Sequence, residues 1–211
     1  MPSPETLYLF AVACVGLVLL PGPAVIYVVT RGVVHGRRAG LMSVFGVETG
    51  NLVQVLAATV GLAAVVASSA EALAIVRYLG AAYLVYLGIR ALLGDGETSE
   101  DRVAPARSDR RLYLDGLLVG ALNPKLALFL LAFLPQFVDP GVGPVWLQTL
   151  VLGLIFNVTA AVGDSLFALA AASAGGRIRR WLRSRRLGHA SGLVYLGLGA
   201  AAALSHGRTK T

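Results

Sequence analysis

Long apolar stretches alternate with short polar ones along the chain, and the apolar stretches have the length of membrane-spanning helices. About 20 apolar residues cross the hydrocarbon core of a bilayer as a helix. By this measure the pattern predicts six spans, at residues 7–30, 40–67, 72–93, 112–136, 145–172 and 187–205. Polar runs such as "RGVVHGRR" and "GGRIRRWLRSRR" separate them. The pattern therefore predicts an all-α membrane protein.

Composition supports this class. Of the 211 residues, 56% are hydrophobic and only 14% are charged, with a mean hydropathy of +0.74. Such a chain has too much apolar surface for an ordinary soluble domain, and we expect one membrane domain over residues 1–211. The single Cys14 cannot form an internal disulfide. The start "MPSPETLYLF" has no basic segment, so we expect the first helix to be retained.

Lys and Arg residues are distributed unevenly among the connectors. Those after spans 1, 3 and 5 hold 14 of the 18 cations, including six Arg between residues 177 and 186. By the positive-inside rule this side is cytoplasmic, which makes 94–111 a cytoplasmic loop and places both termini in the periplasm. We interpret the Arg cluster as a topology signal that contacts anionic lipid, and expect no nucleic-acid partner.

An internal repeat divides the chain into two units of three spans. "LVYLG" occurs in spans 3 and 6, and "LLPGPAVIYVV" in span 1 resembles "LNPKLALFLL" in span 4. The matches occur in the same order, so we expect halves at about 1–93 and 112–205. Because each half has an odd number of spans, the halves must be inverted relative to each other. Inverted repeats with helices broken at corresponding points are typical of secondary transporters.

Both predicted breaks contain proline, and the second also contains a lysine. The residues involved are Pro21, Gly22 and Pro23 in span 1, and Asn123, Pro124 and Lys125 in span 4. Proline lacks the backbone donor that a helix needs, and a central lysine costs about 2.5–3.5 kcal/mol on insertion scales. Lys125 lies too deep to reach either surface, so we expect carbonyls freed at the first break to bind it, with Glu48 or Asp164 as further partners. It would anchor substrate, or simply tie the broken helices together.

Spans 2 and 5 carry further polar residues. Glu48, Asn51 and Gln54 follow one another at steps of three and share one side of span 2, while Asn157 and Asp164 share a face of span 5. An intramembrane carboxylate usually faces a cavity and marks an ion path or substrate site. Glu48 and Asp164 are therefore candidates to carry a coupling proton, and structural hydrogen bonding is the alternative for each.

Close helix contact is predicted by Gly46 and Gly50, which form a small-xxx-small pair. Other Gly and Ala faces permit a homodimer without requiring one. The three histidines form no metal-ligand spacing, and the chain has no nucleophile elbow, phosphate loop or Cys pair. We expect no metal, no cofactor and no enzymatic activity.

Four stretches resemble the LysE/RhtB family of bacterial amino-acid exporters. They are "LLPGPAVIYVVTRGVVHGRRAGL", "YLGAAYLVYLGIRALL", "GALNPKLALFLLAFLPQF" and "RLGHASGLVYLGLGAAAAL". The Pro-Gly-Pro and Asn-Pro-Lys motifs carry the match. The chain departs from the family at Leu20 and Ala24, where members often have Thr and Asn. The resemblance implies a bacterial inner-membrane carrier that exports amino acids, driven by the proton motive force.

The leading hypothesis is a secondary transporter that exports an amino acid or a related small zwitterion in exchange for protons. The substrate carboxylate would meet Lys125 and the amides of the broken helices, with Asn51 and Asn157 as further contacts. Its ammonium group would meet freed carbonyls or a carboxylate. The alternative is a carrier or channel for another small solute, such as a metal cation.

Overall fold

The computed structural model describes residues 2–68 and 108–174, together with isolated positions 82, 85, 86, 89, 193 and 196. All regular structure in this part of the chain is helical, which confirms the predicted class. Apart from those isolated positions, predicted spans 3 and 6 lie outside the described residues, as does most of loop 94–111. The count of six helices and the inverted repeat therefore stay predictions.

Span 1 consists of two helical segments rather than one. Helix α1 (Pro4–Leu19) begins at an N-cap, Ser3, whose side chain accepts a hydrogen bond from the Thr6 N–H at 3.2 Å. The chain then leaves the helix at residues 20–22 and resumes in α2 (Pro23–Ser68). The first part of α2 completes span 1, and the rest forms span 2.

Gly36 separates these two parts of α2. Its φ of 83° and ψ of −177° interrupt the helix, and this left-handed φ favours glycine because a side chain would be strained there. The connector "RGVVHGRR", a polar run between two predicted spans, is therefore helical on both sides of Gly36. The gap between spans 1 and 2 is therefore much shorter in the structure than the sequence pattern predicted.

Span 4 is also divided. Helix α4 (Asp109–Ala121) and helix α5 (Pro124–Ala132) follow each other with a break at residues 122–123. Two short 3₁₀ helices, η1 (Leu134–Phe137) and η2 (Pro140–Val142), then lead into α6 (Val145–Ala174), which forms span 5. The structure thus contains the break predicted in each of spans 1 and 4.

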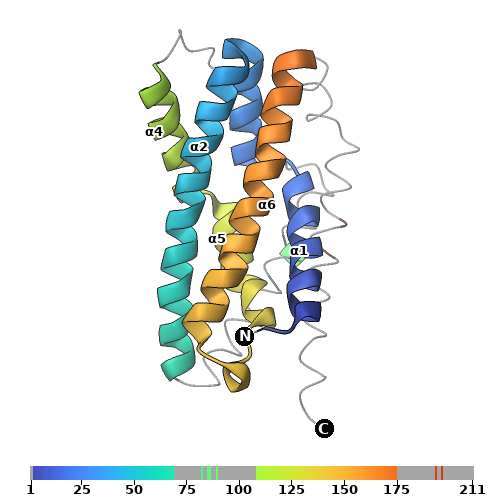
Figure 1. The fold of residues 1–211 in the computed structure, drawn as a ribbon, viewed down its shortest axis with the longest axis vertical. Coiled ribbons are helices and arrows are strands. Elements are labelled where there is room, and N and C mark those ends of the chain that lie inside the picture. The colour runs from blue at the N-terminus through green and yellow to red at the C-terminus, as the bar shows by residue number, and fades with distance from the viewer. Residues whose placement is uncertain are drawn as a thin grey trace.

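The cationic connectors meet at one end of the molecule. Arg38, beside the Gly36 turn, forms an ion pair of 2.7 Å with Asp109 at the start of α4. Arg37 donates a hydrogen bond of 3.1 Å to Ser173 near the end of α6. In Figure 1 this end is at the top, and the N-terminus lies towards the opposite end. The described ends of these connectors therefore share one side, as alternating spans require.

Three helical stretches are long and apolar enough to cross a membrane: Pro23–Ala64, Asp109–Phe137 and Val145–Ser173. Their outward faces are apolar. On α6, for example, Leu154, Val158, Val162 and Leu166 recur every four residues and are all exposed. A stripe of this kind suits contact with lipid or another apolar helix.

Helices α2 and α4 approach so closely that glycine is needed on both. A Cβ atom on Gly50 would collide with the backbone oxygen of Leu117, and one on Gly120 would collide with that of Val47. Gly46 makes a similar approach to α4. The predicted role of Gly46 and Gly50 is thus confirmed, and the matching glycines of α4, Gly116 and Gly120, complete the contact.

An aromatic cluster holds α1 against α5, η1 and α6. The Phe10 ring lies 5.9 Å from Phe129, 6.5 Å from Phe133 and 5.1 Å from Phe137, measured between ring centroids. Phe129 also packs against Phe156 of α6 at 5.5 Å. This cluster fixes the middle of α1 beside the second half of α5 and η1, and so constrains the distance between the two helix breaks.

Replacing Gly50 with Ala tests the close contact between α2 and α4. The new methyl group would meet backbone that cannot rotate away, so we expect a loss of about 1–3 kcal/mol in unfolding free energy, measured by thermal unfolding in detergent. Gly61→Ala on the same helix is the matched control, because nothing lies within 4 Å of a Cβ at Gly61. Equal stability of both variants would contradict the contact.

Candidate functional site

The first break frees backbone carbonyls at the end of α1. Leu20 adopts an extended conformation, with φ −83° and ψ 113°. Pro21 has no N–H, so it cannot donate the helical hydrogen bond that the Leu17 carbonyl would otherwise accept. The Leu20 N–H reaches that carbonyl instead, at 3.2 Å. The Leu20 carbonyl lies beyond the helix, so the break exposes two acceptors inside the molecule.

The second break is built in the same way. Asn123 caps the start of α5, where its side-chain oxygen accepts a hydrogen bond of 3.1 Å from the Lys125 N–H. Pro124 lacks an N–H, so the Gly120 carbonyl loses its helical donor. In both breaks, then, a carbonyl four residues before a proline loses its helical donor. It accepts instead from the N–H of the residue just before the proline, and it can still accept from a partner elsewhere in the protein.

Lys125 supplies that partner to the first break. Its ammonium nitrogen donates hydrogen bonds of 2.8 Å to the Leu17 carbonyl and 2.5 Å to the Leu20 carbonyl. The predicted contact between this lysine and the broken backbone of span 1 is therefore present. A buried charge is tolerated only when such partners replace its water. The bonds link α5 directly to the end of α1.

Gly22 makes room for the lysine. A Cβ atom at this position would lie 2.8 Å from the Lys125 Cδ atom, well inside van der Waals contact. The glycine of the Pro-Gly-Pro motif thus lets the aliphatic stem of the lysine pass directly over the backbone. This explains why the residue between the two prolines has no side chain.

Gln54 of α2 stabilises the second break, a role that the sequence did not reveal. Its side-chain nitrogen lies within hydrogen-bonding distance of three carbonyls, at 2.7 Å from Gly120, 3.0 Å from Ala121 and 3.1 Å from Asn123. The step of three from Glu48 and Asn51 placed Gln54 on the polar side of span 2. Only the packing of α2 against α4 shows that this side faces the break.

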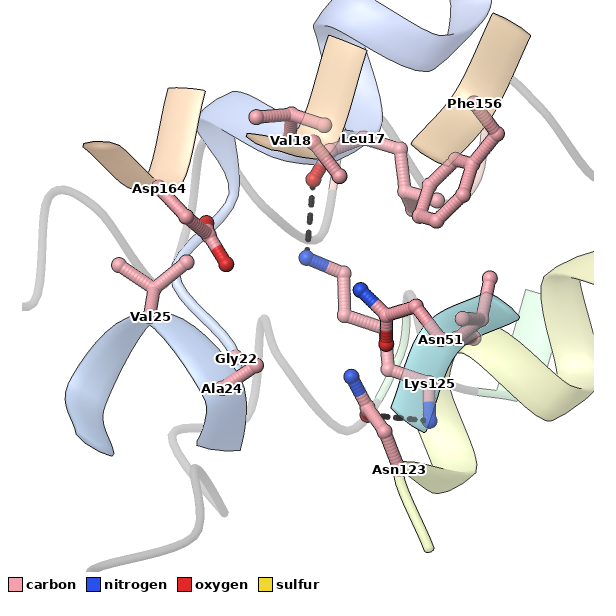
Figure 2. Close-up of a pocket in the computed structure, with 12 residues that line it drawn as sticks. Leu17, Val18, Gly22, Ala24, Val25, Asn51, Asn123, Lys125, Phe156 and Asp164 are labelled. Carbon is pink, nitrogen blue, oxygen red and sulfur yellow. Dashed lines mark hydrogen bonds between the residues drawn. The ribbon is translucent and has the colours of Figure 1, made fainter. Parts of the chain in front are cut away.

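A small cavity lies between the two breaks (Figure 2). Its volume of about 30 Å³ leaves room for about two waters, since one water needs about 10–15 Å³. Its lining includes Gly22 of the first break and four residues with polar or charged side chains, Asn51, Asn123, Lys125 and Asp164. Four helices, α1, α2, α5 and α6, supply the walls. The cavity is therefore a partly open space where these four helices meet.

Asp164 and Lys125 give the cavity opposite charges. Figure 2 shows the Asp164 carboxylate and the Lys125 ammonium pointing into the same space from α6 and α5. They interact electrostatically, yet no ion pair joins them in the described structure. Asp164 is 4% exposed, and no described residue donates a hydrogen bond to its carboxylate. An unpaired buried carboxylate opposite an ammonium group is suited to receive a ligand cation.

Glu48 lies behind the cavity wall. One of its carboxylate oxygens accepts a hydrogen bond of 3.2 Å from the Asn51 side-chain nitrogen, and the other is buried without a partner among the described residues. Glu48 also interacts electrostatically with Asp164. Because Asn51 lines the cavity, its amide connects Glu48 with the site. Its own oxygen is buried and has no hydrogen-bond donor in the described structure.

The structure brings most of the predicted site residues together. Asn51, Asn123, Lys125, Asp164 and Gly22 line the cavity. The prolines at 21, 23 and 124 shape the breaks, and Glu48 contacts the lining residue Asn51. Asn157 is the exception, because it is on α6 but not among the lining residues. The functional role of each residue stays a prediction.

Metal ligands are not gathered in this part of the molecule. Among residues 2–68 and 108–174, no group of three or more His, Cys, Asp or Glu side chains is placed to hold a metal ion. The described site instead offers one cation, one neighbouring anion and amide groups. This donor set is suited to a small organic ion.

Charged groups buried between discontinuous membrane helices are characteristic of transport proteins. The family model described as LysE type translocator matches residues 15–206 of this chain. The chain belongs to this family. It is therefore a multi-pass membrane transporter rather than an enzyme, which confirms the resemblance carried by the two motifs.

Individual relatives are similar over most of their length. The homoserine/homoserine lactone efflux protein of Salmonella typhimurium is 32% identical over 188 residues, covering 87% of this chain and 89% of that protein. The leucine efflux protein of Klebsiella pneumoniae is 29% identical over 199 residues, covering 90% and 91%. An uncharacterized membrane protein of Vibrio cholerae is 29% identical over 185 residues, covering 86% and 88%. No solved structure matches the chain.

Gln54→Leu tests the support of the second break. The substitution removes the donor shared by three carbonyls, so we expect a loss on the order of 2 kcal/mol in unfolding free energy, measured by thermal unfolding in detergent. Thr49→Val is the control on the same helix, since the Thr49 hydroxyl bonds only the Phe45 carbonyl of its own turn. A Gln54→Leu protein as stable as this control would show that the three contacts contribute little.

Proposed function

We propose that this protein is a secondary transporter that exports an amino acid or a related small zwitterion, driven by the proton motive force. The observation that carries the proposal is the pair of opposite charges, Lys125 and Asp164, around one buried cavity between two broken helices. A zwitterion presents the complementary pair of charges. Relatives named as efflux proteins for homoserine, homoserine lactone and leucine support this substrate class.

Lys125 is the proposed anchor for the substrate carboxylate. In the empty site its ammonium binds the Leu17 and Leu20 carbonyls. A carboxylate that enters the cavity would compete for these hydrogen bonds, because an ionised acceptor binds an ammonium more strongly than a neutral carbonyl does. The positive end of α5, which begins at Pro124, would add to the attraction. Binding would then loosen the link between α5 and α1.

Asp164 is the proposed partner of the substrate ammonium, with the free Asn51 oxygen as a second acceptor. A proton on the Asp164 carboxyl would cancel the charge that holds the ammonium group. Substrate and proton would therefore compete for one site, which is the requirement for exchanging one against the other. Glu48 interacts with Asp164 and is the proposed relay, or the alternative proton carrier.

Alternating access would come from the two halves of an inverted repeat, at about 1–93 and 112–205. The matching chemistry of the two breaks supports this arrangement, since each proline leaves a carbonyl that a distant side chain binds. The cationic end, which holds the Gly36 turn and the start of α4, is the proposed cytoplasmic face of the bacterial inner membrane. Both termini would then be periplasmic.

Lys125→Met tests the anchor. Methionine keeps the length of the side chain but cannot bind a carboxylate, so we expect amino-acid efflux from cells to fall at least tenfold, on the order of the effect of losing one buried charged contact. Protein level in the membrane, measured by immunoblot, should stay normal. Lys125→Arg, which keeps the charge, is the matched control and should retain more efflux.

Two other outcomes of this experiment are informative. Normal efflux by Lys125→Met would rule out an essential role for the ammonium group. Loss of the protein itself from the membrane would show that the bonds to Leu17 and Leu20 are needed for assembly, and would favour a structural lysine.

Glu48→Gln and Asp164→Asn test proton coupling. Both substitutions keep the shape of the side chain but remove its titratable proton. We expect at least one variant to lose the acceleration of efflux that an acidic external medium causes, measured in proteoliposomes with an imposed pH gradient. Asp109→Asn is the control, because its carboxylate pairs with Arg38 at the exposed end of the molecule. Full pH-dependent efflux in both variants would exclude these carboxylates as the proton site.

A further inference from the structure

Beyond its two charges, the cavity presents an almost wholly apolar wall. Lys125 and Asp164 are the charged residues among those that line it in the described structure. Apart from Gly22, the other lining residues carry amide or hydrocarbon side chains, the latter from Leu17, Val18, Ala24, Val25, Leu126, Phe156 and Ala160. Figure 2 shows Val18, Leu17 and Phe156 together on one side of the ammonium group. This distribution restricts what the third substituent of a bound amino acid can be.

We infer that the cavity selects amino acids with an uncharged, aliphatic side chain, an inference that rests on the proposed function. The α-carboxylate and the α-ammonium of the substrate would occupy Lys125 and Asp164. The side chain must then face the hydrocarbon wall. It loses its water there and gains contact with apolar atoms, which favours an aliphatic group.

A charged side chain would have no partner in this wall. A second ammonium, as in lysine, would compete with the α-ammonium for the single Asp164 carboxylate. A second carboxylate, as in aspartate, would compete with the α-carboxylate for the single Lys125 ammonium. In either case one charge of the substrate would remain buried without a counterion, and such burial strongly disfavours binding.

The cavity of about 30 Å³ must widen to admit an amino acid, and the apolar side chains that would then meet the substrate belong to the packed core. Phe156 packs against Phe129 of the aromatic cluster in a tilted arrangement, at 5.5 Å between ring centroids. Leu17 and Leu126 are each 1% exposed and belong to the same core. The inference covers only the class of substrate side chain, because a hydrophobic pocket distinguishes poorly between aliphatic side chains that differ by one methylene group.

Counterflow in proteoliposomes tests the inference without any driving force. Vesicles that contain the purified protein are loaded with unlabelled leucine, and uptake of labelled leucine, valine, lysine or aspartate is followed. We expect exchange of leucine and valine, and at least tenfold slower exchange of lysine and aspartate. Each labelled amino acid is also tested against vesicles loaded with the same compound, so that a failure to enter is not confused with a failure to leave.

The outcomes separate this inference from the proposed function. Exchange of lysine or aspartate as fast as that of leucine would overturn the selectivity and leave amino-acid transport standing. Exchange of none of the four would count against the proposed function itself, and the inference would fall with it. Exchange of leucine and valine alone would support both.

Val18→Asp offers a gain-of-function test of the wall. Aspartate matches valine in size and adds the missing counterion, so we expect the ratio of lysine to leucine exchange to rise at least tenfold. Val18→Asn is the matched control, since it has the same shape and polarity without the charge. An equal rise in both variants, or none in a Val18→Asp protein that still exchanges leucine, would contradict the role of the uncharged wall. If neither variant assembles in the membrane, the exchange rates of the four amino acids by the wild-type protein decide whether the selectivity holds.

Discussion

The arrangement of this protein depends on backbone carbonyls that proline leaves without a donor inside a membrane. Hydrocarbon offers no water, so each freed carbonyl must be satisfied by the protein itself. Pro21 and Pro124 create this need at Leu17 and Gly120. The residue before each proline supplies one local N–H, and the further donors, the Gln54 amide and the Lys125 ammonium, come from distant parts of the chain. Satisfying these carbonyls therefore joins helices that are not neighbours in sequence.

The two breaks are stabilised by different chemistry, and the difference matters for function. Gln54 holds the second break with a neutral amide that contacts three carbonyls, which suits a fixed joint. Lys125 holds the first break with a charge, which an anion can compete for. The lysine is thus a structural tie in the empty cavity, and in the proposed function it would also be the binding group for the substrate carboxylate. These two roles are compatible and need not be alternatives.

Close packing places the polar groups accurately. The glycines of α2 and α4 allow the backbones to touch, and this brings the side of α2 that carries Glu48, Asn51 and Gln54 against the second break. Phe10 and its aromatic neighbours fix α1 against α5 and η1. The glycine contact between α2 and α4 and the aromatic cluster around Phe10 are both apolar, and together they position the polar groups of the site. In a membrane such contacts gain little from hydrophobicity and rely on shape.

The sequence by itself determined the helical membrane class, the breaks at 21–23 and 123–125, and the family, because these follow from local properties such as hydropathy, missing donors and motif spacing. It also indicated that Lys125 needs an internal partner, since a deep charge cannot reach water. Only the tertiary structure decided which carbonyls bind Lys125 and Gln54, that Asp164 reaches the cavity, and that Asn157 does not line it. Helical periodicity gives the direction of a side chain around its own axis but not what another helix places there. The aromatic and glycine contacts between helices supply that information, because they fix how each helix is rotated against its neighbours.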